Sequence, residues 1–261
     1  MIAIDIGNTN LNFALIQNDK IKTTFRLKTT SVNKKLIDKA LEKYKKEDTV
    51  ICSVVPSVTK LLKRVKPKIK IVGQDIQVPI KCRYDKKKVG QDRLVTAYAA
   101  KNIFPKTRMI IDFGTAITLD FISKKGAYQG GLILPGIGST LRVLSNCALL
   151  PKKIKSFKPT PTIPKNTQSS VSKGINEGFS LMINSLVKKY KRKLHLKASE
   201  RIVITGGEAG IITDKLDFSF KYKPFLVLEG LWMLHKNRPI FSSKKIQKNF
   251  KKILTSNTLT V

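Results

Sequence analysis

The chain has 261 residues, 41% of them hydrophobic, which is enough for one large domain or two modest ones. Lys and Arg number 51 against 17 Asp and Glu, and the net charge of +34 raises nucleic acid, anionic membranes or phosphorylated ligands as partners. The lysines are spread in pairs along the chain rather than gathered in one arginine-rich arm. A solvated basic surface is therefore the better interpretation, and nucleic acid is not an expected partner.

The three cysteines exclude two classes of small scaffold. Their number is odd and no C-x-x-C occurs, so neither a disulfide framework nor a zinc site is expected. Cys52, Cys82 and Cys147 lie in apolar stretches and are expected to be small core residues.

No apolar run approaches the roughly 20 residues of a membrane helix. No basic segment precedes the first charge, Asp5, so no signal peptide is predicted and a cytoplasmic location is expected.

The first part of the chain alternates strand and helix patterns. β-branched apolar runs predict strands over 1–7, 11–17, 22–28, 49–55 and 68–72. Helical spacing of apolar residues predicts helices from the expected N-cap Ser31 through Tyr44 and over 57–65. A further helix over 90–104 would link this part to the next.

The second part restarts the same order. Strands are predicted over 108–114, 116–123, 126–134 and 201–207, and helices over 136–150, about 170–193 and 224–236. Three prolines make 156–166 a loop. The offset between the two openings is 112 − 5 = 107 residues, which fits a duplicated β-β-β-α-β-α-β domain. We expect an α/β fold with halves at 1–106 and 107–240 and a basic tail at 241–261.

Each half opens on a strand that ends in D-x-G. Asp5 and Gly7 lie in "IAIDIGNTN", and Asp112 and Gly114 lie in "MIIDFGTAIT". The glycine lets the chain turn tightly, so that backbone N–H groups can bind a phosphate. A carboxylate beside bound phosphates can hold Mg²⁺ or its waters. Two such turns facing each other would hold a polyphosphate from both sides, which is what phosphoryl transfer requires.

Several other nucleotide-binding classes are excluded. The chain has no G-x-x-x-x-G-K-[ST] and no G-x-G-x-x-G after a strand, which excludes P-loop and Rossmann sites. "DFG" at 112–114 is not accompanied by an H-R-D loop or a Gly-rich loop, which excludes a protein kinase.

Six motifs in order, "DIGNTN", "GQDR", "DFGTA", "GGLILPG", "NTQSS" and "VITGGEA", resemble those of type III pantothenate kinase over about residues 1–236. The resemblance implies the actin and sugar-kinase fold, with two ribonuclease-H-like domains and a nucleotide cleft between them. It also implies ATP-dependent phosphorylation of pantothenate to 4′-phosphopantothenate, the first step of coenzyme A synthesis.

The resemblance assigns roles to particular residues. It implies ATP and phosphate contacts by Asp5, Ile6, Gly7, Asn8, Thr9, Asn10, Leu11, Asn12 and Thr115, with Thr205, Gly206 and Gly207 on the adenosine side. It implies pantothenate contacts by Tyr84, Gly90, Gln91, Asp92, Arg93 and Thr167. Asp92 would be the catalytic base, and Arg93 would bind the pantothenate carboxylate. Asp5 would hold Mg²⁺ through water, and Asp112 would hold the monovalent cation, K⁺ or NH₄⁺. Thr167 would reach the neighbouring site of a homodimer.

One residue departs from the family pattern, and two other functions stay open. Many members carry Lys where this chain has Asn12, so ATP binding could be weaker or a nearby lysine could substitute. From the residues alone, Asp92 and Arg93 also fit an ordinary helix start. A nucleic-acid-binding accessory protein, like the Bvg accessory factors, would use the same scaffold. Another small-molecule kinase or a nucleotide hydrolase would use the same fold.

Overall fold

The computed structural model describes residues 1–85, 88–147 and 163–236. In its first half the elements are β1 (Ile2–Ile6), β2 (Asn10–Gln17), β3 (Lys20–Lys28), α1 (Lys34–Leu41), β4 (Thr49–Ser53), α2 (Pro56–Val65) and β5 (Ile69–Ile71). After α3 (Gln91–Ile103) come β6 (Thr107–Phe113), β7 (Ala116–Ile122), β8 (Tyr128–Pro135), α4 (Ile137–Ser145), α5 (Thr167–Lys193), β9 (Arg201–Thr205), β10 (Lys221–Tyr222) and α6 (Leu226–His235). Short 3-10 helices lie at Thr29–Ser31, Glu42–Tyr44, Ala209–Ile211 and Thr213–Lys215.

The two halves build equivalent sheets. The strand order is β3-β2-β1-β4-β5 in the first sheet and β8-β7-β6-β9-β10 in the second. The opening strand of each half is central, antiparallel to the next strand and parallel to the first strand after the helices. Asp5 pairs with Asn12 of β2, and Asp112 pairs with Thr118 of β7. The predicted α/β class and its duplication are therefore confirmed.

The second half does not repeat the predicted β-β-β-α-β-α-β order in full. Two helices, α4 and α5, lie between β8 and β9, and only 3-10 helices lie between β9 and β10. The segment after β9 carries Gly206, Gly207 and Gly210, and Gly206 has a φ of +94°. Glycine is a poor helix former, and a positive φ is outside the helical region, so these glycines disfavour an α-helix in this segment.

Two helix starts also differ from the sequence prediction. Ser31 lies in a 3-10 helix, and the N-cap of α1 is Asn33, whose side-chain oxygen accepts a hydrogen bond from the N–H of Leu36 at 2.9 Å. Helix α5 begins at Thr167, three residues earlier than predicted, because Asn166 caps it through the N–H of Ser169 at 2.9 Å.

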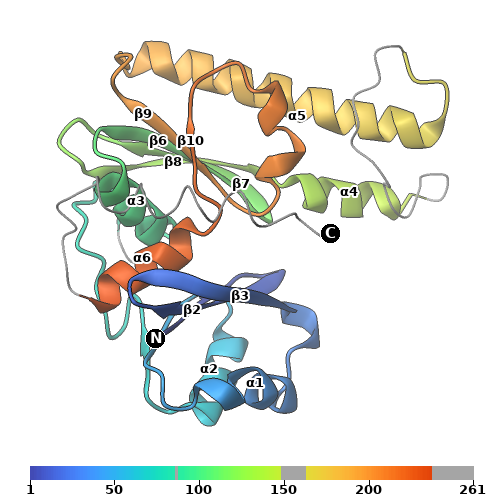
Figure 1. Cartoon of the computed structure of the whole chain (residues 1–261). Helices are drawn as coiled ribbons and strands as arrows, with labels where there is room; N and C mark the ends of the chain where they lie inside the picture. Colours follow the sequence, from blue (N-terminus) through green and yellow to red (C-terminus); the bar gives the residue numbers. More distant parts are fainter. Residues whose placement is uncertain (86–87, 148–162, 237–261) are drawn as a thin grey trace.

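The structure is built in layers (Figure 1). Helices α1 and α2 cover the outer face of the first sheet, α3 and α6 lie between the sheets, and α4 and α5 cover the outer face of the second sheet. The middle core joins both sheets, with Ala3, Cys52, Ile110 and Val203 packed among α3 and α6 residues. This middle layer is where the two opening strands present their inward faces.

The three cysteines differ in their exposure. Cys52 is buried and Cys82 partly buried, but Cys147 is exposed, so its prediction as a core residue is wrong. The reason is that α4 ends at Ser145, which leaves Cys147 beyond the helix.

Among the described residues no helix is long and apolar enough to cross a membrane. The tail at 241–261 and most of the predicted 156–166 loop lie outside the described residues.

Candidate active site

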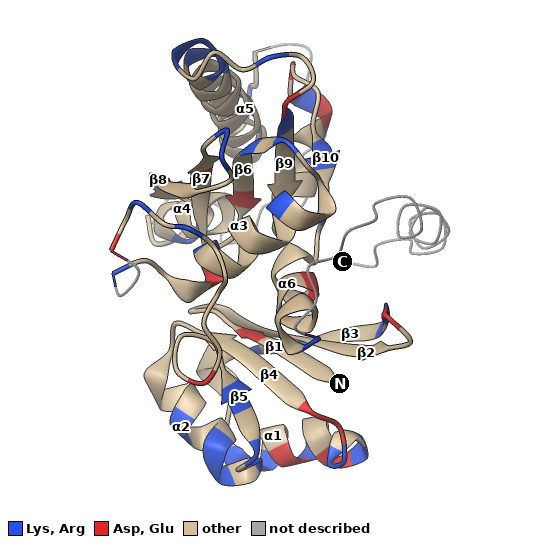
Figure 2. Ribbon diagram, turned by 90° about the vertical axis from the view of Figure 1, so that its left-hand side faces the viewer, with Lys and Arg blue, Asp and Glu red and all other residues tan. Residues whose placement is uncertain are grey.

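Strand alternation directs two aspartates into the middle layer. Side chains two residues apart share one face of a strand. Ala3 packs in the middle core, so Asp5 faces the same way, and Ile110 does the same for Asp112. Figure 2 shows acidic segments on β1 and β6, whereas Lys and Arg lie mainly on outer elements such as α2 and α5. The two strands therefore direct their carboxylates toward each other from opposite sheets.

The turns that follow these strands meet. In the first turn the N–H of Gly7 donates to the carbonyl of Asn10 at 2.9 Å, and in the second the N–H of Gly114 donates to Ala116 at 3.2 Å. The hydroxyls of Thr9 and Thr115 lie 2.8 Å apart and form a hydrogen bond between the two halves. Ile6 and Leu11 are buried on the α1 and α2 side, so only their backbone can approach a ligand in this junction.

The start of α3 brings a third carboxylate to the junction. Asp92 folds back over the helix start, and its Oδ1 accepts the N–H of Arg93 at 2.9 Å. A Cβ on Gly90 would lie only 2.4 Å from that oxygen, so the glycine is required for the fold-back. Gln91 packs over Gly73, where a Cβ would lie 2.9 Å from its side-chain carbon. These contacts fix the positions of Gly90, Gln91 and Asp92 at the start of α3.

The three carboxylates share one buried, acidic environment. Burial, with a smaller contribution from the charge of Asp92, raises the pKa of Asp5 from 3.8 to about 7, against an opposing hydrogen bond from Asn12. Burial, then Asp92 and Asp5, raise the pKa of Asp112 to about 8. Burial also raises the pKa of Asp92. In the described part of the chain no Lys or Arg forms an ion pair with any of the three. Such a cluster favours binding of cations.

Arg93 is held by a residue that the sequence analysis did not select. Its Nε and Nη2 donate to Oδ1 of Asp120 at 3.0 and 2.6 Å. The hydroxyls of Tyr128 and Thr118 also donate to Asp120, at 2.6 and 2.9 Å. Asp120 is thus a buried anchor, and one edge of the Arg93 guanidinium is already occupied. A carboxylate in the middle of the apolar run "AITLDFIS" was the signal that could have found it.

Tyr84 lies on the same side of the junction as the Arg93 cluster. The chain before it pairs with β8, because the N–H of Arg83 donates to the carbonyl of Tyr128 at 3.0 Å. The Tyr84 ring lies 3.4 Å from where a Cβ on Gly130 would be. About half of the Tyr84 side chain is exposed, so its ring is accessible to a ligand.

Thr167 lies apart from the other candidate residues. It is the first residue of α5 and is exposed, and Figure 1 shows α5 starting on the side of the molecule away from α3. None of the contacts within the described residues joins Thr167 to the carboxylates. A contribution from Thr167 to this site would have to come from a second chain.

The loop after β9 completes the junction. A Cβ on Gly206 would lie 2.5 Å from Oδ1 of Asp112 and 2.4 Å from the carbonyl oxygen of Phe113. The next acidic residue, Glu208, accepts the N–H of Gly138 at 3.0 Å and so ties the start of α4 to this loop. Gly206 of the predicted "ITGG" motif therefore lies directly against the second aspartate. Glu208 belongs to the longer motif "VITGGEA" but was given no role there, and the structure shows that it joins two segments.

Within the described residues, no three Asp, Glu, His or Cys side chains converge closely enough to hold a metal ion by themselves. A divalent ion near Asp5 would take most of its ligands from phosphate oxygens and water, as Mg²⁺ commonly does. The buried carboxylates fit that requirement, since each supplies a hard oxygen ligand.

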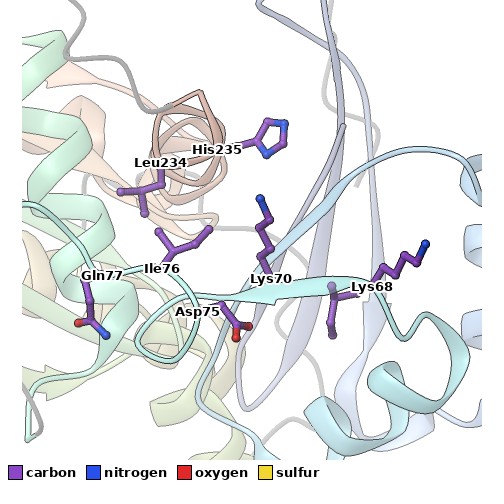
Figure 3. Close-up of a pocket in the computed structure, with 8 residues that line it drawn as sticks. Lys68, Lys70, Asp75, Ile76, Gln77, Leu234 and His235 are labelled. Carbon is purple, nitrogen blue, oxygen red and sulfur yellow. The ribbon is translucent and has the colours of Figure 1, made fainter.

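A separate pocket lies on the far edge of the first sheet. It has a volume of about 630 Å³ and lies between β5 and the end of α6, lined by Lys68, Lys70, Asp75, His235 and neighbouring residues. Figure 3 shows Lys70 directed toward His235 across this pocket, while Lys68 is directed away. None of the three junction aspartates lines it, so it is distinct from the candidate active site.

Comparison with known proteins finds relatives that match most of the chain. The family model of type III pantothenate kinase matches residues 1–189. A type III pantothenate kinase from Sulfurihydrogenibium sp. is 34% identical over 256 residues, covering 90% of this chain and 99% of the relative. The corresponding protein from Persephonella marina is 35% identical over 253 residues, with 90% and 98% coverage.

Solved structures support the fold. A protein assigned to the Baf family of transcriptional activators from Campylobacter jejuni matches with a TM-score of 0.62 at 23% identity, covering 92% of this chain and 99% of that one. The activator of 2-hydroxyisocaproyl-CoA dehydratase from Clostridium difficile, solved with bound ADPNP, matches with a TM-score of 0.56 at 12% identity over both full chains. The extent and identity of the sequence matches show that this chain belongs to the type III pantothenate kinase family.

Proposed function

We propose that this chain transfers the γ-phosphoryl group of ATP to the primary hydroxyl of pantothenate, giving 4′-phosphopantothenate and ADP in the first step toward coenzyme A. The observation that carries the proposal is the meeting of Asp5, Asp112 and Asp92 from β1, β6 and α3, beside two glycine turns joined at Thr9 and Thr115. This arrangement supplies the positioning and charge control that phosphoryl transfer needs.

Asp92 is the residue proposed as the base. The hydroxyl of pantothenate would attack the γ-phosphorus as the bond to the β-phosphate oxygen breaks, and its proton would pass to the carboxylate of Asp92. The raised pKa brings this carboxylate closer to the working pH, which favours general-base catalysis. Its position at the start of α3, beside the two turns, fits a base that acts between nucleotide and acceptor.

Two of the three aspartates are proposed to hold the cations that the reaction uses. We propose that Asp5 binds Mg²⁺ through water and Asp112 binds K⁺ or NH₄⁺. Burial, and then the charge of nearby carboxylates, raise the pKa values of both groups, so a bound cation would stabilise their ionised forms. Mg²⁺ would neutralise charge on the transferred phosphate.

The acceptor would bind on the Arg93 side. Asp120 occupies the Nε edge of Arg93, which leaves the remaining guanidinium N–H groups for the pantothenate carboxylate. Tyr84, Gly90 and Gln91 would line the same region.

We also propose a homodimer in which Thr167 completes the neighbouring site. Thr167 is exposed at the start of α5 and is distant from the site of its own chain.

The chain organisation and location form part of the same proposal. We place the domain division near residue 106, between α3 and β6, and the enzyme in the cytoplasm, where its substrates would be made. A nucleic-acid-binding accessory role is not favoured, because all three junction aspartates are present and the basic residues lie mainly on the outer elements.

The test is a turnover assay with ATP, Mg²⁺, K⁺ and pantothenate, with mass spectrometry of the product. We expect a product heavier by one phosphoryl group and stoichiometric ADP. ADP release without phosphorylated pantothenate would indicate a hydrolase instead. Phosphorylation of a different small alcohol in preference to pantothenate would retain the kinase class and reject the substrate.

A further inference from the structure

Positive charge from the protein, in addition to the proposed cations, would help the acidic junction to hold a polyphosphate. Three buried carboxylates face the region between the turns, and the Arg93 guanidinium is paired with Asp120. ATP adds several further negative charges. A side chain that lies between the first turn and the glycine loop after β9, and that donates hydrogen bonds to phosphate, would offset this repulsion.

Arg26 lies in that position. It is opposite Asn12 in the pairing of β3 with β2, and its Nε donates to Oδ1 of Asn12 at 3.0 Å. The Nδ2 of Asn12 in turn donates to Oδ2 of Asp5 at 3.2 Å. The amide of Asn12 therefore links the arginine to the first aspartate.

Strand alternation explains why this arginine faces the junction. Phe25 and Leu27, on either side of Arg26, pack toward the core under α1 and α2. Arg26 consequently points from the opposite face of the sheet, the face on which Asp5 lies. Thr29, the first residue after the same strand, donates its hydroxyl to the carbonyl of Gly7 at 2.7 Å, so the end of β3 is fixed against the first turn.

The guanidinium also reaches the second half. Its Nη2 lies 3.3 Å from where a Cβ on Gly207 would be. Gly207 therefore provides space for the arginine, and any larger residue would press on it. In the described part of the chain the Nε–Asn12 bond is the hydrogen bond that Arg26 makes, which leaves its Nη groups for a ligand.

We propose that Arg26 binds the phosphates of ATP between the first turn and the Gly206–Gly207 loop, with Asn12 orienting its guanidinium. The inference rests on the proposed kinase function and adds to it a binding residue from β3. It also answers the question raised by Asn12, since the cation beside it is an arginine on the neighbouring strand rather than a lysine.

The experiment compares Arg26→Gln and Arg26→Lys with Lys22→Gln, an exposed position on the same strand. Dissociation constants for ATP and for adenosine are measured by calorimetry, with thermal melting to confirm folding. A hydrogen bond to a charged group contributes enough for Arg26→Gln to weaken ATP binding by about 10- to 100-fold. Adenosine binding should not change, because adenosine carries no phosphate. Arg26→Lys should recover part of the loss, and Lys22→Gln should match the parent protein.

Three outcomes separate the inference from the function on which it rests. A parent protein that neither binds ATP nor phosphorylates pantothenate rejects the proposed function. An active parent, with unchanged ATP affinity in Arg26→Gln, rejects the role of Arg26 alone. Equal weakening of ATP and adenosine would show a structural effect and would also reject that role. If Arg26→Gln does not fold, Arg26→Lys, which keeps the charge, gives the second test, with weakened ATP binding and unchanged adenosine binding expected.

Discussion

Removal of the Asp120 carboxylate should destabilise the protein strongly. Asp120 is only 2% exposed and accepts two hydrogen bonds from Arg93 and one each from Tyr128 and Thr118. In Asp120→Ala the Arg93 side chain, itself 15% exposed, would keep its charge without a partner. Breaking a buried ion pair by removing one member costs about 3–5 kcal/mol. The residual exposure of Arg93 places the expected loss near the lower end, about 3 kcal/mol.

The assay is equilibrium unfolding in urea, monitored by circular dichroism. Asp38→Ala, which removes an exposed carboxylate from α1, is the control and should change the free energy of unfolding by less than about 0.5 kcal/mol. Combining Asp120→Ala with Arg93→Met should cost less than the sum of the single changes, because the unpaired charge is then absent. A loss below about 1 kcal/mol in Asp120→Ala, or strict additivity, would refute the reasoning.

Three further predictions follow from the geometry of the two turns. Gly206→Ala should destabilise the protein and weaken the proposed K⁺ binding at Asp112, because the new methyl group would lie 2.5 Å from Oδ1 of that residue. Gly210→Ala, with open space around it, should do neither in melting experiments and cation titrations. Thr9→Val and Thr115→Val should be coupled by about 0.5–1.5 kcal/mol in a double-mutant cycle on the free energy of unfolding, and additive losses would contradict their contact. Burial beside other carboxylates raises the pKa of Asp112 from 3.8 to about 8, so the folded state holds a proton that the unfolded chain releases. The cation-free protein should therefore lose stability as the pH rises from about 4 to 8, and Asp112→Asn should flatten this dependence in urea titrations.

The sequence predicted the features that depend on local pattern. Two apolar strands ending in D-x-G, together with the repeated order of strands and helices, predicted a duplicated α/β fold. The topology confirms that Asp5 and Asp112 are equivalent. The N-cap of α1 was wrong by two residues because Ser31 and Asn33 are both good capping residues, and only the chain direction after β3 decides between them.

The contacts that the sequence did not predict depend on register and docking. Arg26 meets Asn12 only because β2 and β3 pair in one particular register. Asp120 meets Arg93 only when α3 docks against β7, which no local pattern specifies. Glu208 likewise gains its role from the approach of α4 to the loop after β9. Such pairings join residues far apart in the chain, so spacing alone cannot reveal them.

The central claim is that Asp92, placed by α3 beside the two aspartate turns, takes the proton from the acceptor hydroxyl. The most direct measurement is kcat for pantothenate phosphorylation in Asp92→Asn at saturating ATP, Mg²⁺ and K⁺, with ATP affinity measured on the same sample. General-base catalysis contributes about 100-fold or more, so kcat should fall by at least that factor while ATP remains bound. An unchanged kcat in a folded variant that binds ATP would contradict the account.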